Sequence, residues 1–501
     1  MYGSGSGRPR SYSYHLKGKL DTRLSLLIRS RVNMNDSFLR SYVMKKMFAA
    51  LMLAFFLCFT VSTQTVTDGD LKAVKQLDSQ DRDAKGNLKT LPAEDHIKRG
   101  FVYLDNRQFP AAREHFSRVI DAYPTDPLLS RALFGLARSF MWEKRYVSAI
   151  TYFARLSSEF PDTKDGRDGL AFMGACYVRI GKNDDAAQTY ERYTVAYPTG
   201  EKIDSAYLNI IDALRESGRY DEALRWVEKT LERFGSTPTA VNAMHARLRL
   251  EISRRNWNGA VTAADELLKM PKLSGSMTTD AEVRYLRAFS LENAGKRTEA
   301  VSAYSAIPDT NGNYWGGLAS EKLASLSRLK RTTRITSTDL AEYPIMFRNE
   351  VLQYSKPDGI DPRFILALMK QESSFRPGIK SPSAARGLLQ LVIDTALKYS
   401  DSAGFHKLAP DDLYKPSVNV AIGCAYIADL KNQFDGLNEA IAASYNGGED
   451  NARRWLNRTN SKDPGIFTSE IGFAETKNYV FKVMSFYRIY TELFDKDLNK
   501  K

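Results

Sequence analysis

Glu372 is the residue of this chain whose type and position best suit acid–base chemistry. With Ile365, Leu368 and Met369 it follows the i, i+3, i+4, i+7 spacing of one helix face, so an apolar stripe ends in a carboxylate. Asp361-Pro362 supplies an N-cap and a first-turn proline, which places Glu372 near the C-terminal end of that helix. Burial and the negative end of the helix dipole both raise the pKa of a carboxyl group. We therefore expect Glu372 to hold a proton near neutral pH and to donate it to a leaving group, as glycosidic cleavage requires.

The segment that follows predicts a second helix with a polar side chain available for binding. Ser381-Pro382 repeats the cap-then-proline start of a helix, and Gly387 falls inside the helical pattern that comes next. A glycine within a helix costs conformational entropy, so it indicates close approach by a ligand or by another backbone. Gln390 is then positioned to offer a neutral amide to a sugar.

Two further segments place polar side chains at helix ends. A short apolar helix stopped by Gly447-Gly448 carries Tyr445 and Asn446 in its last turn, where polar groups are available to a ligand. The final helix of the chain holds Glu475 and Tyr479 at i and i+4, so both lie on one face beside an apolar and aromatic stripe.

Residues 343–495 resemble the catalytic domain of the soluble lytic transglycosylases, lysozyme-like enzymes that cut bacterial peptidoglycan. Four short motifs in family order carry the resemblance: Gln371-Glu372-Ser373, Gly387-Leu388-Leu389-Gln390, Tyr445-Asn446-Gly447, and Glu475-Thr476-Lys477-Asn478-Tyr479-Val480. Two departures are visible, because the family usually has proline where this chain has Ile393 and Ala-Gly-Pro where it has Gly447-Gly448-Glu449. Neither departure touches the acid, but both affect loop shape.

The resemblance implies a role for each motif residue. Glu372 is expected to be the sole acid/base, and the expected substrate-binding residues are Ser373, Gln390, Tyr445, Asn446, Glu475 and Tyr479. Structural roles stay open for several of them, because buried amides such as Gln390 and Asn446 commonly satisfy loop backbone. Glu475 and Tyr479 could equally tie the last helix to the core.

No convincing second carboxylate accompanies Glu372, whereas ordinary glycosidases use two. By resemblance, the N-acetyl group of the muramic acid sugar replaces the missing nucleophile. The product would then be a 1,6-anhydromuramic acid, formed by cleavage of the β-1,4 bond to N-acetylglucosamine. Two alternatives stay open: a lysozyme-type hydrolase that uses the same Glu372 with water, and a non-catalytic envelope scaffold. No cofactor or metal is expected, since neither a phosphate-binding loop nor Cys/His zinc spacing occurs.

The front half of the chain, residues 92–328, is built from repeats. Alanines recur 37 residues apart, with one slightly longer final step, at Ala112, Ala149, Ala186, Ala223, Ala260 and Ala300. Pro124, Pro161 and Pro198 keep the same period and are expected to close each second helix. The pattern resembles a tetratricopeptide-type solenoid of helical hairpins. We therefore predict an all-α chain, in which the solenoid either guides glycan strands or docks an envelope protein partner.

The first 66 residues indicate export. Residues 48–61 form a mostly apolar run behind Lys45 and Lys46, too short for a stable membrane span, so residues 44–66 are predicted to be a signal peptide. Residues 1–43 precede this credible start and are interpreted as a non-native or mis-assigned extension. Residues 67–91 and 329–342 are predicted linkers. The expected location is the periplasm, with no lasting transmembrane anchor.

The charge of the chain gives no reason to expect nucleic acid as a partner. The net charge is +13, but residues 1–43 carry +6 of it and Lys45 and Lys46 two more, which leaves about +5. No basic cluster interleaved with aromatic residues occurs. A weakly basic surface instead suits peptidoglycan, whose peptides carry carboxylates. Cys176 and Cys424 are expected to be small buried residues.

Overall fold

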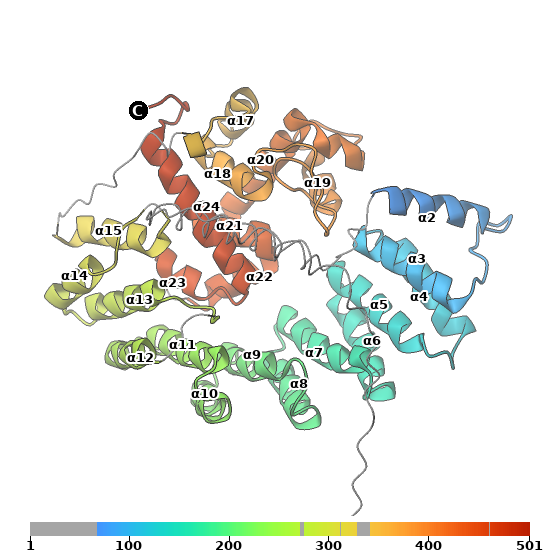
Figure 1. Cartoon of the computed structure of the whole chain (residues 1–501), viewed down its shortest axis with the longest axis horizontal. Coiled ribbons are helices and arrows are strands. Elements are labelled where there is room, and N and C mark those ends of the chain that lie inside the picture. The colour runs from blue at the N-terminus through green and yellow to red at the C-terminus, as the bar shows by residue number, and fades with distance from the viewer. Residues whose placement is uncertain (1–67, 271–274, 311, 328–340, 460) are drawn as a thin grey trace, which may run out of the picture. The chain divides into compact units, whose positions relative to one another are not determined.

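The computed structural model describes residues 68–270, 275–310, 312–327, 341–459 and 461–501, and within those ranges the chain is helical (Figure 1). The only extended pairings there are isolated bridges, such as that between Lys380 and Arg386. The described residues fall in one compact unit, Thr65–Lys501. The predicted all-α class is confirmed.

The front half forms helical hairpins in chain order, and Figure 1 shows them side by side. Its helices are α2 (Asp68–Gln80), α3 (Ala93–Asp105), α4 (Phe109–Ala122), α5 (Leu129–Trp142), α6 (Tyr146–Glu159), α7 (Lys164–Arg179), α8 (Asn183–Ala196), α9 (Ile203–Glu216), α10 (Tyr220–Phe234), α11 (Pro238–Ser253), α12 (Trp257–Lys269), α13 (Asp280–Asn293), α14 (Arg297–Ser305) and α15 (Tyr314–Ser327). Each even-numbered helix from α4 to α14 packs on the helix before it, as a repeat solenoid requires.

The periodic alanines explain the spacing of these hairpins. Each is the fourth residue of the second helix in its hairpin, and each is fully buried, as Ala112 and Ala260 illustrate. A methyl side chain at that point lets the two helix backbones approach closely. Pro124, Pro161 and Pro198 follow the ends of α4, α6 and α8, where a proline prevents further helix.

Helix α2 occupies most of the segment that we expected to be a linker. Asp78 of α2 is buried and accepts hydrogen bonds from Tyr103 Oη at 2.6 Å and from Arg99 at 2.8 Å. The His115 ring lies 3.0 Å from the same carboxylate. These contacts hold the pKa of Asp78 at about 2 against the effect of burial, which opposes ionisation. The polar sequence of α2 gives no strong helix signal of its own. Contacts with α3 and α4 stabilise this helix.

The second half surrounds a core in which α18 packs on α24 (Figure 1). Its helices are α17 (Arg348–Ser355), α18 (Pro362–Ser373), α19 (Ile393–Ser400), the 3-10 helix η1 (Pro410–Tyr414), α20 (Pro416–Gln433), α21 (Asn438–Gly447), α22 (Glu449–Asn457), α23 (Pro464–Ser469) and α24 (Ala474–Leu493). Helix α21 also contacts α24, so three motif-bearing helices meet in one core.

The predicted helix after Ser381-Pro382 is wrong. Residues 381–391 form turns held by the bridges of Arg386 with Lys380 and Leu391. Gly387 has φ +80, and a Cβ there would lie 2.1 Å from the Leu413 carbonyl oxygen. The close approach predicted for this glycine is therefore to backbone. Ser-Pro starts turns as readily as helices, and the contacts that decided the outcome come from η1 and α20.

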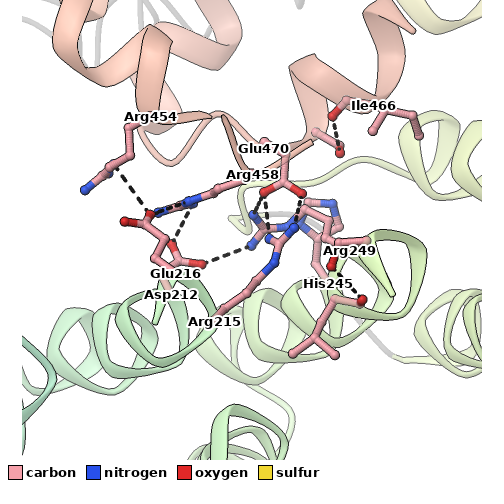
Figure 2. A network of polar contacts seen from close by, with 12 residues as sticks. Asp212, Arg215, Glu216, His245, Arg249, Arg454, Arg458, Ile466 and Glu470 are labelled. Carbon is pink, nitrogen blue, oxygen red and sulfur yellow. Dashed lines mark hydrogen bonds and ion pairs between the residues drawn. The ribbon is translucent and has the colours of Figure 1, made fainter. Parts of the chain in front are cut away.

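Buried ion pairs join the repeats to the second half. Glu470, just after α23, accepts hydrogen bonds from Arg215 of α9 at 2.6 and 2.7 Å and from Arg249 of α11 at 2.9 Å (Figure 2). All three side chains are almost fully buried. Lys477 of α24 donates to Glu282 of α13 at 2.7 Å. Because unpaired buried charges are costly, these contacts fix how the repeats and the second half pack together.

No helix within the described ranges is long and apolar enough to cross a membrane. The predicted signal peptide at 44–66 and the extension at 1–43 lie outside the described residues. Most of the predicted linker 329–342 does so as well.

Replacing Glu470 with glutamine should destabilise the protein by about 3–5 kcal/mol, because the change leaves two arginines buried without their anion. Denaturant unfolding of Glu470→Gln against wild type measures the loss, and the exposed Glu232→Gln in α10 is the matched control. The arginines hold the pKa of Glu470 at about 2, below its ordinary 4.5. The stabilisation is thus present above about pH 4.5, and the difference between the two proteins should shrink as pH falls toward 2. Equal stabilities at pH 7 would contradict this assignment.

Candidate active site

Helix α18 positions Glu372 as the sequence predicted. Asp361 caps the helix by accepting the Arg363 backbone N–H at 3.0 Å, and Pro362 is its first residue. The stripe residues Ile365, Leu368 and Met369 are completely buried, but Glu372 is partly exposed. The apolar stripe therefore anchors the helix while the carboxyl retains access to solvent.

The carboxyl of Glu372 is strongly desolvated and has one side-chain hydrogen-bond donor. Burial raises its pKa to about 7, and the hydrogen bond from Tyr479 Oη to Oε1, 2.6 Å long, partly offsets that rise. No charged side chain of the described residues contributes to the shift. A carboxyl with this pKa is protonated in about half of the molecules at neutral pH, so it can serve as an acid and then as a base.

Tyr445 lies in the same electrostatic environment. Burial raises its pKa well above the ordinary value, and the neighbouring charge of Glu372 raises it further. Its hydroxyl donates to the Leu389 carbonyl at 2.6 Å, and its ring packs against Tyr426. The second and third motifs therefore meet next to the acid.

Gln390 uses its amide to hold the preceding turn. Nε2 donates to the Gly387 carbonyl at 2.8 Å and to the Ile379 carbonyl at 3.3 Å, and the residue itself has φ +45. The structural role that the sequence left open for Gln390 is therefore present in this structure.

The remaining motif residues divide between exposed and buried positions. Asn446 and Glu475 are exposed, and Asn446 Oδ1 accepts the hydroxyl of Thr476 at 2.7 Å, which links the third motif to the fourth. Ser373 is buried, and its hydroxyl donates to the Met369 carbonyl at 3.1 Å, within its own helix. Ser373 thus differs from the others in having its hydroxyl turned onto the helix backbone.

The two departures from the family pattern lie at helix starts. Ile393 is the first residue of α19 and is buried. Gly448 has φ +88 and directly precedes Glu449, the first residue of α22. Both positions thus lie where a helix begins, and neither residue contacts Glu372 through a hydrogen bond.

Sequence reasoning missed the residues that hold the fourth motif in place. Lys477 is buried within the motif, and its ammonium donates to Glu282, which also lies 2.9 Å from the His245 ring. An interior lysine in an otherwise apolar helix face was the available signal, but its partner is far away in the sequence. Thr476 likewise gave no indication that it would bond Asn446.

Comparisons with known families agree with both halves of the chain. The family model described as Transglycosylase SLT domain matches residues 350–467. The family model described as Tetratricopeptide repeat matches residues 98–162 and 175–238. The first match includes Glu372, Gln390, Tyr445 and Asn446, and it ends before Glu475.

Among curated proteins, the chain is 25% identical over 291 residues to the soluble lytic murein transglycosylase of Salmonella typhimurium, covering 55% of this chain and 42% of that protein. It is 33% identical over 154 residues to the membrane-bound lytic murein transglycosylase C of Shigella sonnei, covering 26% of this chain and 43% of that protein. The chain thus spans less than half the length of either relative.

Among solved structures, the lytic transglycosylase Slt of Pseudomonas aeruginosa, an inactive mutant, is 19% identical with a TM-score of 0.46, covering 79% of this chain and 72% of that one. That likeness is too distant to bear on function. The family matches are local and specific, and they fall on the two regions that the sequence motifs had separated. The chain therefore carries a transglycosylase SLT domain preceded by tetratricopeptide repeats, and it is related to the soluble lytic murein transglycosylases.

Proposed function

We propose that this protein is an exported lytic transglycosylase that cleaves the β-1,4 bond between N-acetylmuramic acid and N-acetylglucosamine in peptidoglycan. The observation that carries the proposal is the partly exposed carboxyl of Glu372, whose pKa burial raises to about 7, inside the SLT match. Its hydrogen bond with Tyr479 brings the first and fourth motifs together. The names of the curated relatives support the substrate class.

Glu372 acts twice in the proposed reaction. Its proton goes to the glycosidic oxygen, so the bond from C1 of the muramic acid to that oxygen breaks while the sugar's own N-acetyl oxygen attacks C1. The resulting carboxylate then removes the proton from O6, and O6 displaces the N-acetyl oxygen to close the 1,6-anhydro ring. Water is not consumed, and Glu372 ends protonated. A carboxyl with a pKa near 7 suits both steps, because neither protonation state is strongly favoured.

Tyr479 and Tyr445 are proposed to set the environment of the acid. The Tyr479 hydroxyl stabilises the carboxylate that forms after the first proton transfer, since it donates to Oε1. Tyr445 lies close enough to Glu372 to be affected by its charge, and there its fixed hydroxyl dipole can stabilise an oxocarbenium-like state. Gln390, Asn446, Glu475 and Ser373 remain proposed substrate-binding residues.

The proposed location is the periplasm, since the relatives are named as murein-degrading enzymes. We propose that the repeats either guide glycan strands toward Glu372 or bind an envelope protein. The buried ion pairs between the repeats and the second half favour strand guidance, because they hold the array against the catalytic half.

Glu372→Gln should slow the release of anhydro-muropeptides from purified sacculi by about 100- to 10,000-fold, the usual value of acid–base catalysis. The amide has nearly the same shape as the carboxyl, so the protein should fold normally, and the exposed Glu299→Gln in α14 is the matched control. Rates are measured by chromatography of the soluble products. Full activity in Glu372→Gln would overturn the assignment.

Mass spectrometry of the same products distinguishes the two alternatives. A hydrolase would release ends heavier by one water than anhydro ends. A non-catalytic scaffold would clear no peptidoglycan in zymograms of either wild type or Glu372→Gln.

The rate should fall as pH rises through about 7, because the proton that Glu372 donates is then lost. Tyr479→Phe removes the hydrogen bond that lowers the pKa of Glu372, so the falling limb of its kcat/KM profile should move to higher pH. The pH profiles of wild type and Tyr479→Phe test this. An unshifted limb would show that Tyr479 does not tune the acid.

A further inference from the structure

A cavity of about 480 Å³ lies where the repeats meet helix α22, and five arginines line it. They are Arg179, Arg215, Arg453, Arg454 and Arg458. The only carboxylates that line it are Glu216 and Asp450, and none of the motif residues of the candidate active site is among its lining residues. The lining thus carries more cationic than anionic side chains.

Two of these arginines are neutralised by neighbouring carboxylates. Arg458 bonds Glu216 at 2.5 Å and Asp212 at 3.2 Å, and Arg215 is paired with Glu470 (Figure 2). Both pairings are buried and close. They fix the wall of the cavity and leave those guanidinium groups little capacity for another anion.

Arg454 has no comparable partner. Its Nε is buried and makes no hydrogen bond within the described chain. The nearest carboxylate oxygen, Oε1 of Glu216, lies 3.6 Å away and is already bonded to Arg458, as Figure 2 shows. A buried guanidinium N–H without an acceptor is uncommon in folded proteins and calls for a physical explanation.

Arg179 is also without a counterion. Its guanidinium makes no hydrogen bond or ion pair with any residue of the described ranges. The other acid of the lining, Asp450, pairs with Lys144 at 3.1 Å and accepts the Tyr146 hydroxyl at 3.4 Å. The carboxylates at the cavity thus make their closest contacts with other residues. Arg179 has no ion pair within the described ranges, and Arg454 has only the 3.6 Å contact with Glu216.

The electrostatics of Arg454 agree with this geometry. Burial lowers its pKa to about 10, and the positive charges of Arg458 and Arg179 lower it further, while Glu216 offsets only part of the effect. Arg454 and Arg179 line the same cavity and carry like charges, which repel each other. An anion held between them would remove that repulsion.

We propose that this cavity binds a small ligand through an oxyanion, a carboxylate or a phosphate, held between Arg179 and Arg454. Guanidinium groups recognise both oxyanions through paired, charge-assisted hydrogen bonds. The volume of the cavity accommodates a peptide terminus or a phosphorylated small molecule. The anion site itself does not depend on the proposed catalytic activity. Only the idea that a peptidoglycan peptide supplies the carboxylate rests on that activity.

The position of the cavity gives the site a route to the candidate active site. Arg453 and Arg454 belong to α22, which is separated by Gly448 alone from α21, the helix that carries Tyr445 and Asn446, and α22 packs on α21. An anion held by Arg454 would therefore restrain the helix that follows the sugar-binding motif. Peptidoglycan peptides carry carboxylates, so a bound strand could supply one. Free phosphate compounds could supply the other oxyanion.

Isothermal titration of the full-length protein tests the proposal with three probes. A free stem tetrapeptide supplies carboxylates, the same peptide amidated at its carboxyl groups is the uncharged control, and sodium phosphate represents the second source. Arg179→Gln removes an unpaired charge without breaking an ion pair, so it should fold normally. Arg454→Gln is the second variant, and the exposed Arg192→Gln of α8 is matched for loss of charge.

We expect the acidic peptide or phosphate to bind the wild type and Arg192→Gln equally, and each pocket variant about tenfold more weakly or worse, since one charge-assisted contact is lost. Binding of the peptide alone would identify a carboxylate ligand, and binding of phosphate alone would identify a phosphate ligand. The proposal is overturned if neither probe binds, if the amidated peptide binds as well as the acidic one, or if Arg179→Gln leaves the affinity unchanged. Because titration does not depend on turnover, an inactive Glu372 site would leave this result intact.

Discussion

The desolvation of one carboxyl group, that of Glu372, is the constraint on which the candidate site depends. The carboxyl retains a proton near neutral pH only while the packing of α18 on α24 keeps it desolvated. Tyr479 must also stay its one side-chain hydrogen-bond donor, because each further donor would lower the pKa. A cation at hydrogen-bond distance would lower the pKa and remove the acid. The site therefore depends on apolar surroundings that desolvate the carboxyl while leaving Glu372 partly exposed, more than on additional polar groups.

Helix α24 links the carboxyl of Glu372 to the rest of the chain. Within two turns, Thr476 bonds Asn446, Lys477 bonds Glu282 of the repeats, and Tyr479 bonds Glu372. The three side chains are buried and lie within about one turn of the same helix, and they contact different neighbours. A shift of α24 against the repeats would consequently change the donor at the acid. The buried ion pair with Glu282 is thus physically connected to the candidate site through α24 as well as contributing to stability.

Local patterns were sufficient for part of this structure. The alanine period predicted the hairpins, and the capping and apolar spacing around residues 361–372 predicted α18, because both signals act within one helix. The turns at residues 381–391 were predicted as helix, since Ser-Pro fits both states and Asn419 decides between them by donating to the Arg386 and Leu413 carbonyls. The pairs Arg215–Glu470 and Lys477–Glu282 join residues 255 and 195 positions apart, beyond the reach of any local pattern.

A raised pKa does not by itself identify a catalytic acid in this protein. Burial also raises the pKa of Glu439 to about 7, but that side chain is only 5% exposed and its carboxyl receives the Tyr314 hydroxyl at 3.3 Å. Glu439 borders a different cavity, whose lining includes none of the motif residues. Burial thus raises the pKa of both carboxyls, but the two groups differ in what they can reach. Glu372 has solvent access and two motif tyrosines in its immediate surroundings, and this combination of desolvation with access favours it as the proton donor.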